Sequence, residues 1–322
     1  MCVMAFHFVP AFEHVAALGS MGVRLFFVLS GFLITQILMA SRDQALGASL
    51  QSFYLRRSLR IFPVFYTVLA LAWLLNIGPV RQTFTWHISY LTNAYLFHRN
   101  DWHGSISHLW SLAVEQQFYV LWPFLVFTVP GRWRTMVVVL AMCAAPLSRW
   151  VIGGPMTSVL PTSCLDSLGA GALLAMPATA SRARRVGAIT GIPVLVAAWW
   201  FGPLVQNAVA AEILIDVGVS LTAMWIVGTA ATTHGWTLLA MRPMQWLGTI
   251  SYGAYLIHGF APYLAGRYVA GFTGMMWPLR TAILVASTLA AAQASWVFLE
   301  TPFLAMKDRV SPRRPLQRPR AA

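Results

Sequence analysis

The chain has 322 residues, of which 58% are hydrophobic and only 10% are charged, and its formal net charge is +13. Soluble globular domains carry roughly 25% charged residues. So few charges cannot cover a soluble surface, which excludes a soluble enzyme and predicts an all-α polytopic membrane protein. Most of the positive charge lies in short loops between apolar segments, where it sets topology, so nucleic acid is not expected as a partner.

Ten transmembrane helices are expected, because a helix needs about 20 mostly apolar residues to cross a bilayer. Residues 1–12 correspond to the end of a first span, and they reach only about 18 Å as a helix. We therefore expect the first helix to be truncated and an upstream start to supply its missing residues. The alternative is a true truncation, which would leave a protein of little or no activity. Nine further spans are predicted at residues 22–40, 61–78, 109–129, 135–152, 164–180, 186–202, 213–233, 246–265 and 279–299.

The basic residues alternate between the two sides of these spans. Loops after the even-numbered helices and the C-terminal tail hold most of the 22 lysines and arginines, among them Arg132, Arg184 and Arg242. Positive loops favour the cytoplasm, so both termini are expected there. We predict one transmembrane domain at residues 1–305 and a basic, Pro-rich cytoplasmic tail at 306–322 that lies on membrane lipids.

Arg57 and Arg60 lie three residues apart, on one helical face at the expected cytoplasmic boundary. Guanidinium forks match phosphate oxygens in a bidentate manner, so this pair is a candidate phosphate-binding site. The alternative is a topology signal with lipid-headgroup contacts. No Gly-rich phosphate loop supports nucleotide hydrolysis.

Four polar side chains share one face of the span at 109–129, within about 80° on a helix. They are His108, Ser111, Glu115 and Tyr119. Glu115 is the only acidic residue in that span, and a carboxylate inside a membrane is a candidate functional residue. The structural alternative is an internal salt bridge to an arginine such as Arg24. In either case Glu115 should face the interior of the bundle.

Two further regions contain candidate residues. Ser251, Tyr255 and His258 fall within about 60° on one face of the span at 246–265. A single buried histidine is more often a satisfied polar group than a catalyst, and Ser251 suits hydrogen bonding between helices. His7 stands in an apolar run near the start of the chain. Histidine is well suited to take a proton from a hydroxyl near neutral pH, so His7 is a candidate catalytic residue.

The remaining histidines and the cysteines predict no metal site and no disulfide. Their spacing fits no ligand motif or paired-cysteine pattern. The residues concerned are His87, His98, His103, Cys2, Cys143 and Cys164.

These segments together resemble the acyltransferase 3 family of integral membrane O-acyltransferases, which modify bacterial surface polysaccharides and other glycans. By this resemblance, His7 falls on the first-helix histidine thought essential for acyl transfer. Arg57 and Arg60 fall on the pair thought to engage acyl-CoA, and an arginine eleven residues before the histidine would lie upstream of Met1. The matching segments, in order, are Gly22 to Thr35, Arg57 to Pro63, Leu109 to Tyr119, Gly169 to Ala175, Leu247 to His258 and Glu300 to Pro302.

The resemblance implies an enzyme of the bacterial inner membrane that moves an acyl group, expected to be acetyl, from cytoplasmic acyl-CoA to a glycan. The acceptor would be a hydroxyl of a cell-surface or lipid-linked saccharide. Arg57 and Arg60 would hold the CoA phosphates, and His7 would act as general base or acyl relay. Glu115 would orient or charge-balance a histidine or an arginine, and no metal is required. Residues expected to bind or support the substrates are Arg24, Ser251, Tyr255 and His258.

A transporter or flippase for a glycolipid or an anionic solute is the alternative function. Charges inside a membrane also mark transport paths, which is the reason to consider it. The sequence contains no evident inverted repeat, which many transporters have.

Overall fold

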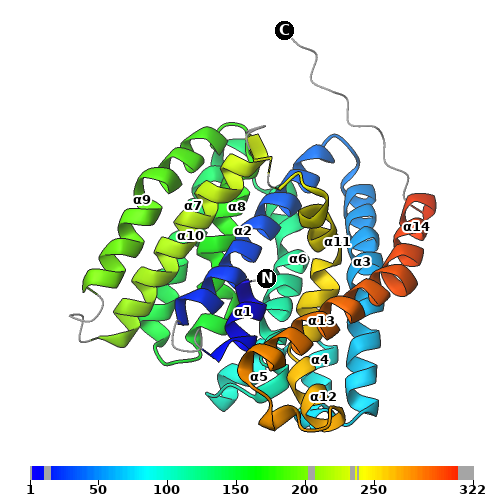
Figure 1. Cartoon of the computed structure of the whole chain (residues 1–322). Helices are drawn as coiled ribbons and strands as arrows, with labels where there is room; N and C mark the ends of the chain where they lie inside the picture. Colours follow the sequence, from blue (N-terminus) through cyan, green and yellow to red (C-terminus); the bar gives the residue numbers. More distant parts are fainter. Residues whose placement is uncertain (1, 11–15, 202–206, 233–235, 238, 311–322) are drawn as a thin grey trace.

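The computed structural model describes residues 2–10, 16–201, 207–232, 236–237 and 239–310 (Figure 1). Every regular element in these ranges is a helix, which confirms the all-α class. Five helices there are long and apolar enough to cross a membrane: Gly19–Ala40, Leu46–Leu74, Gly131–Ile152, Ala208–Thr232 and Trp277–Met306. Ten spans with a truncated first helix remain a prediction, as does the single transmembrane domain. Most of the expected C-terminal tail lies outside the described residues.

The α-helices follow one another along the whole described chain. They are α1 (Cys2–Phe8), α2 (Ala16–Ala40), α3 (Leu46–Leu74), α4 (Phe84–Ile88), α5 (Thr92–Arg99), α6 (Leu109–Thr128), α7 (Gly131–Ile152), α8 (Leu165–Ala175), α9 (Ala180–Phe201), α10 (Ala208–Thr232), α11 (Arg242–His258), α12 (Ala261–Tyr268), α13 (Trp277–Ser295) and α14 (Thr301–Val310). Short 3-10 turns are η2 (Gly78–Arg81), η3 (Gly104–Ile106), η4 (Thr157–Val159), η5 (Pro161–Cys164) and η7 (Phe272–Gly274), and the π-helix η8 (Trp296–Glu300) joins α13 to α14.

Two expected spans differ from the helices observed. The span predicted at 164–180 is α8, whose 11 residues extend only about 16 Å at 1.5 Å per residue and cannot cross alone. The span predicted at 246–265 is two helices, because α11 ends at His258 and α12 begins at Ala261. Hydropathy averaged over a window does not show where a helix ends, so both predicted spans were longer than the helices observed.

Helix α2 runs through the middle of the molecule. Figure 1 shows α7, α8, α9 and α10 on one side of it, and α3, α11, α13 and α14 on the other. The backbones of α2 and α8 touch, since a Cβ on Gly31 would lie 2.1 Å from the Leu168 carbonyl oxygen. Gly171 approaches the Val28 carbonyl equally closely. Small residues allow this contact, as is common between membrane helices.

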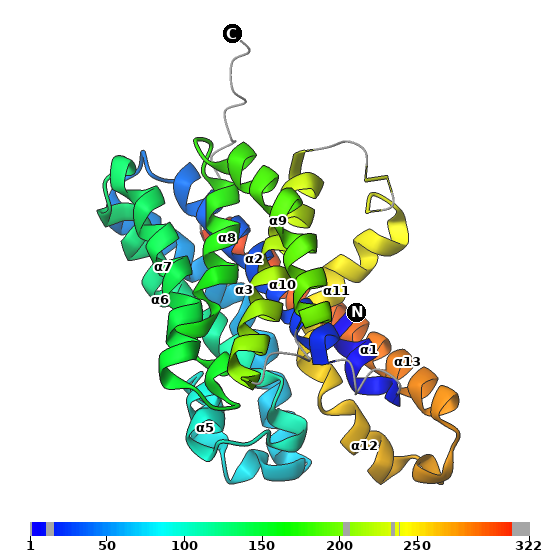
Figure 2. The ribbon, with the colours of Figure 1, turned by 90° about the vertical axis from the view of Figure 1, so that its left-hand side faces the viewer.

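The exterior of the bundle is apolar. Leu121, Val151, Trp199 and Phe298 expose 69–78% of their surface, and an apolar exterior of this kind is suited to lipid. Polar side chains are buried between the helices instead. Figures 1 and 2 both show α5 and α12 at one end of the bundle. A cavity lined in part by Pro262 and Tyr263 of α12 lies at this end.

Candidate active site

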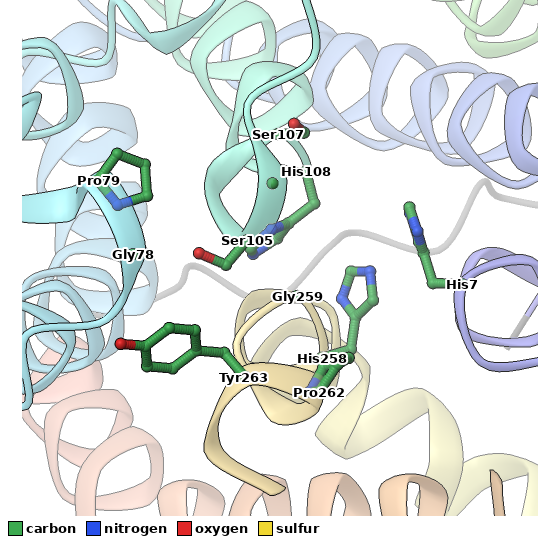
Figure 3. Close-up of a pocket in the computed structure, with 11 residues that line it drawn as sticks. His7, Gly78, Pro79, Ser105, Ser107, His108, His258, Gly259, Pro262 and Tyr263 are labelled. Carbon is green, nitrogen blue, oxygen red and sulfur yellow. The ribbon is translucent and has the colours of Figure 1, made fainter. Parts of the chain in front are cut away.

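A cavity of about 380 Å³ lies where α1, α11, α12 and the residues just before α6 meet the turns η2 and η3. Three histidines from distant parts of the chain line it: His7 of α1, His108 just before α6, and His258 at the end of α11 (Figure 3). Gly78 and Tyr263 belong to the remaining wall. The sequence predicted His7 and His258 as separate candidates, and the structure brings them into one site.

The three imidazole rings are neighbours. The ring centroids of His7 and His258 are 5.3 Å apart, and those of His108 and His258 are 4.9 Å apart. His7 is exposed to the cavity, whereas the other two are buried. His108 was predicted only as one member of a polar helix face. His108 and His258 are far apart in the chain, so no spacing pattern in the sequence could predict that they are neighbours.

Backbone carbonyls in the last turn of α11 accept hydrogen bonds from two of these rings. His258 Nδ1 donates a hydrogen bond to the Tyr255 carbonyl, and His108 Nε2 donates one to the Leu256 carbonyl over 3.0 Å. The last carbonyls of a helix lack partners within it, so they are available as acceptors. The end of α11 at His258 therefore fixes the orientation of both histidines.

Tyr255 connects α11 to the start of α6. Its hydroxyl lies 2.6 Å from Ser111 Oγ and donates to the His108 carbonyl over 3.2 Å. Ser251 does not share this environment: it is exposed, and its hydroxyl donates to the Gly248 carbonyl within α11. Helical periodicity placed Ser251 on the same face of α11 as Tyr255 and His258. It could not show that this face is exposed at the position of Ser251.

Glu115 lies deeper along the same face of α6. Ser30 Oγ donates to Glu115 Oε1 over 2.7 Å, and the Tyr119 hydroxyl donates to the same oxygen. Glu115 is only 4% exposed, so it faces the interior as expected. The guanidinium of Arg57 lies over the Tyr119 ring, 5.2 Å from its centroid. Glu115 is within electrostatic range of both Arg57 and Arg60.

The salt bridge suggested between Glu115 and Arg24 is wrong. Arg24 instead pairs with Asp166 over 3.0 Å and with Asp216. Arg149 pairs with the same two aspartates, so two buried cations balance two buried anions. Burying charges requires such compensation. The network joins α2, α7, α8 and α10, and it gives Arg24 a supporting position in the fold rather than a place in the histidine cavity.

Arg57 and Arg60 lie well away from the cavity along the bundle axis. Tyr119 of α6 lies beneath Arg57 and is eleven residues from His108, which immediately precedes α6. This separation corresponds to about 16 Å along the helix. Both arginines are half-buried on α3. The polar face of α6 joins the two ends, with Ser111 and Glu115 between them.

Glu300 is a buried acidic residue in the segment from Glu300 to Pro302 that resembles a family motif. It is 2% exposed, and neither carboxylate oxygen has a hydrogen-bond partner among the described residues. It lies in the π-helix η8, a kind of element often found at functional sites. Arg60 is within electrostatic range of its carboxylate.

The other histidines and cysteines form no metal centre in the described ranges, where no group of three or more potential ligands occurs. His87 is fully buried, and its ring nitrogens lie 2.7 Å from Thr83 Oγ1 and 2.8 Å from Thr92 Oγ1. Burial lowers the pKa of His87 to about 4, so it is a neutral structural residue. Cys143 and Cys164 are free thiols.

Comparison with known proteins identifies the family. A family model described as an acyltransferase domain matches residues 1–297. The chain belongs to the acyltransferase 3 family. This confirms the resemblance based on the sequence motifs, while the roles of individual residues stay predictions. No solved structure matches this chain.

Two curated relatives of this acyltransferase family member cover most of its length. Peptidoglycan O-acetyltransferase OatA of Listeria monocytogenes is 27% identical over 321 aligned positions, which cover 88% of this chain and 51% of the relative. YrhL of Bacillus subtilis, provisionally named a peptidoglycan O-acetyltransferase, is 26% identical over 326 positions, covering 88% of this chain and 50% of the relative. The chain thus spans about half the length of these relatives.

Proposed function

We propose that this chain is a membrane O-acyltransferase that moves an acetyl group from acetyl-CoA to a hydroxyl of a glycan. The convergence of three histidines on one cavity, in a member of an acyltransferase family, carries this proposal. Two relatives bear the name peptidoglycan O-acetyltransferase, so peptidoglycan is the first acceptor to test. The proposed enzyme lies in the bacterial inner membrane with both termini in the cytoplasm.

The donor would bind with its phosphates at Arg57 and Arg60. Two guanidinium groups on one side of α3 offer several N–H donors to phosphate oxygens. Tyr119, next to Arg57, and His108, in the cavity, are about 16 Å apart along the axis of α6. A thioester placed in the cavity must therefore lie far from phosphates bound at the arginines. The long pantetheine arm of CoA provides that separation. Glu115 would balance the arginine charge between the two ends.

Transfer would join the acceptor oxygen to the acetyl carbonyl carbon. The carbon–sulfur bond of the thioester breaks, and the hydroxyl proton is passed on to the departing CoA sulfur. His7 is exposed to the cavity and would act as general base or as relay of the acetyl group. The proposed reaction needs no metal.

The transporter or flippase alternative receives no specific support. The polar side chains on α6 are hydrogen-bonded to neighbouring helices. Family membership and the names of the relatives both favour acyl transfer.

The test uses the full chain in lipid nanodiscs with labelled acetyl-CoA and a peptidoglycan disaccharide fragment. We expect label on the glycan with the wild-type protein and with His98→Ala, which removes an exposed histidine outside the cavity. His7→Ala should fold and bind acetyl-CoA but transfer no label. If the wild-type protein acetylates no glycan, the proposed function is wrong.

A further inference from the structure

His258 has a fixed tautomer. A carbonyl oxygen only accepts hydrogen bonds, so the bond from Nδ1 to the Tyr255 carbonyl places the ring proton on Nδ1. In the neutral imidazole, Nε2 then carries a lone pair and can only accept a hydrogen bond. The side chain is 0% exposed, and Nε2 has no partner among the described residues.

No described residue donates a hydrogen bond to this nitrogen, and His258 lines the cavity. The Tyr255 hydroxyl is engaged with Ser111 and with the His108 carbonyl, and His108 Nε2 donates to Leu256. An unpaired buried acceptor is unfavourable. Figure 3 shows the ring of His258 between His7 and His108, directed into the space that the three share. A ligand that enters this space with a hydroxyl group would supply the donor.

Ser105 adds a second unpaired polar atom to the same cavity. Its hydroxyl oxygen is buried and has no hydrogen-bond partner in the described part of the chain. Ser105 and His258 both line the cavity. A ligand with several hydroxyl groups, such as a saccharide, can satisfy both atoms, whereas an apolar ligand leaves both unpaired.

We propose that His258 is a second catalytic histidine, whose Nε2 binds the acceptor hydroxyl and takes its proton during acyl transfer. This role rests on the proposed function. As the acceptor oxygen bonds to the acetyl carbon, its proton moves to Nε2, the carbon–sulfur bond breaks, and the proton passes to the CoA sulfur. A histidine held through Nδ1–H by a backbone carbonyl presents Nε2 in a fixed direction, as a general base requires. His7 lies on the other side of this space. It would then act on the acetyl group, while His258 acts on the acceptor hydroxyl.

The decisive variant is His258→Gln, studied as the full chain in lipid nanodiscs. Glutamine has a similar size and can still donate to the Tyr255 carbonyl, but it cannot take a proton. We expect the variant to fold and to bind acetyl-CoA, while acetyl transfer to a peptidoglycan disaccharide falls by roughly 10²–10⁴-fold, the usual contribution of a general base. Transfer at the wild-type rate would overturn the proposal, and so would loss of acetyl-CoA binding together with transfer.

Chemical rescue separates catalysis from a structural role. In His258→Ala the missing ring leaves space next to the cavity, so added imidazole should restore part of the transfer rate. Imidazole should not help His258→Gln, whose side chain fills that space. The matched control is His87→Ala, which removes an equally buried histidine outside the cavity; imidazole should leave its rate unchanged. Equal stimulation of both alanine variants would overturn the proposal.

The two proposals fail in different ways. If the wild-type protein transfers no acetyl group to the glycan, the proposed function is wrong and the role of His258 is wrong with it. If the wild-type protein and His258→Gln transfer equally well, only the role of His258 is wrong. Should His258→Ala fail to fold, the result for His258→Gln decides alone.

Discussion

The imidazole of His108 lies directly against the backbone of Gly259. A Cβ added at position 259 would be 2.1 Å from His108 Nδ1, far closer than any tolerated contact. Gly259 directly follows His258, the last residue of α11, and His108 directly precedes α6. The contact between His108 and Gly259 therefore joins the end of α11 to the beginning of α6. The cavity therefore depends on the absence of a side chain at Gly259.

Gly259→Ala should displace His108 and disturb the cavity. We expect the free energy of unfolding to fall by about 1–3 kcal/mol, the usual cost of overpacking, and acetyl transfer to fall with it. Thermal unfolding and transfer assays in nanodiscs measure both. The control is Gly266→Ala on α12, where a Cβ would meet nothing within 4 Å. If the two variants were equally stable and equally active, the cavity would not depend on the contact between His108 and Gly259.

Arg57→Ala and Arg60→Ala should weaken acetyl-CoA binding. Each lost charge-assisted hydrogen bond costs about 1.5–3 kcal/mol, so the dissociation constant should rise by more than tenfold. Lysine should rescue only in part, because it lacks the bidentate fork. Arg42→Ala removes an exposed charge from the loop before α3 and should bind normally. Normal binding by both alanine variants would mean that the arginines serve topology alone.

Glu115→Gln tests the charge between the two ends of the site. The amide keeps the size of the side chain and can still accept from Ser30 and Tyr119, but it no longer balances the arginines. We expect strongly reduced transfer and a loss of about 1–3 kcal/mol in stability from altered buried hydrogen bonds. Asp101→Asn, at an exposed position, is the control. Full activity of Glu115→Gln would exclude a role for its charge.

Arg24→Leu should be among the most destabilising changes in the molecule. It leaves Asp166 and Asp216 with one cation between them, and breaking a buried ion pair costs about 3–5 kcal/mol. Adding Asp216→Asn should recover part of the loss, because it removes the unpaired charge. Chemical unfolding in detergent measures both. A loss no larger than that of Arg99→Ala, at an exposed site, would refute the importance of the network.

Topology can be tested with single cysteines in a chain that lacks its three native ones. Cysteines at Arg132 and Arg242 should be protected from an impermeant thiol reagent in intact cells, whereas those at Arg99 and Arg267 should react. All four positions are exposed, so protection reports sidedness rather than burial. Labelling at Arg132 from outside would reject the expected orientation.

Relations between side chains of the same helix could be predicted from the sequence alone. It predicted a helical membrane protein, and it placed Ser111, Glu115 and Tyr119 on one buried face of α6. These predictions succeed because the rise and turn of a helix fix the direction of each side chain relative to its neighbours. The family motifs were also local strings, and they sufficed to identify the family.

Which helix faces contact one another became clear from the packed structure. It showed that His7, His108 and His258 share a cavity, that Arg24 pairs with aspartates rather than with Glu115, and that Ser251 lies outside the site. Such contacts depend on the packing of helices distant in the chain, for which spacing carries no information. The break at the end of α11 was equally hidden, although the free carbonyls it creates orient two of the three histidines.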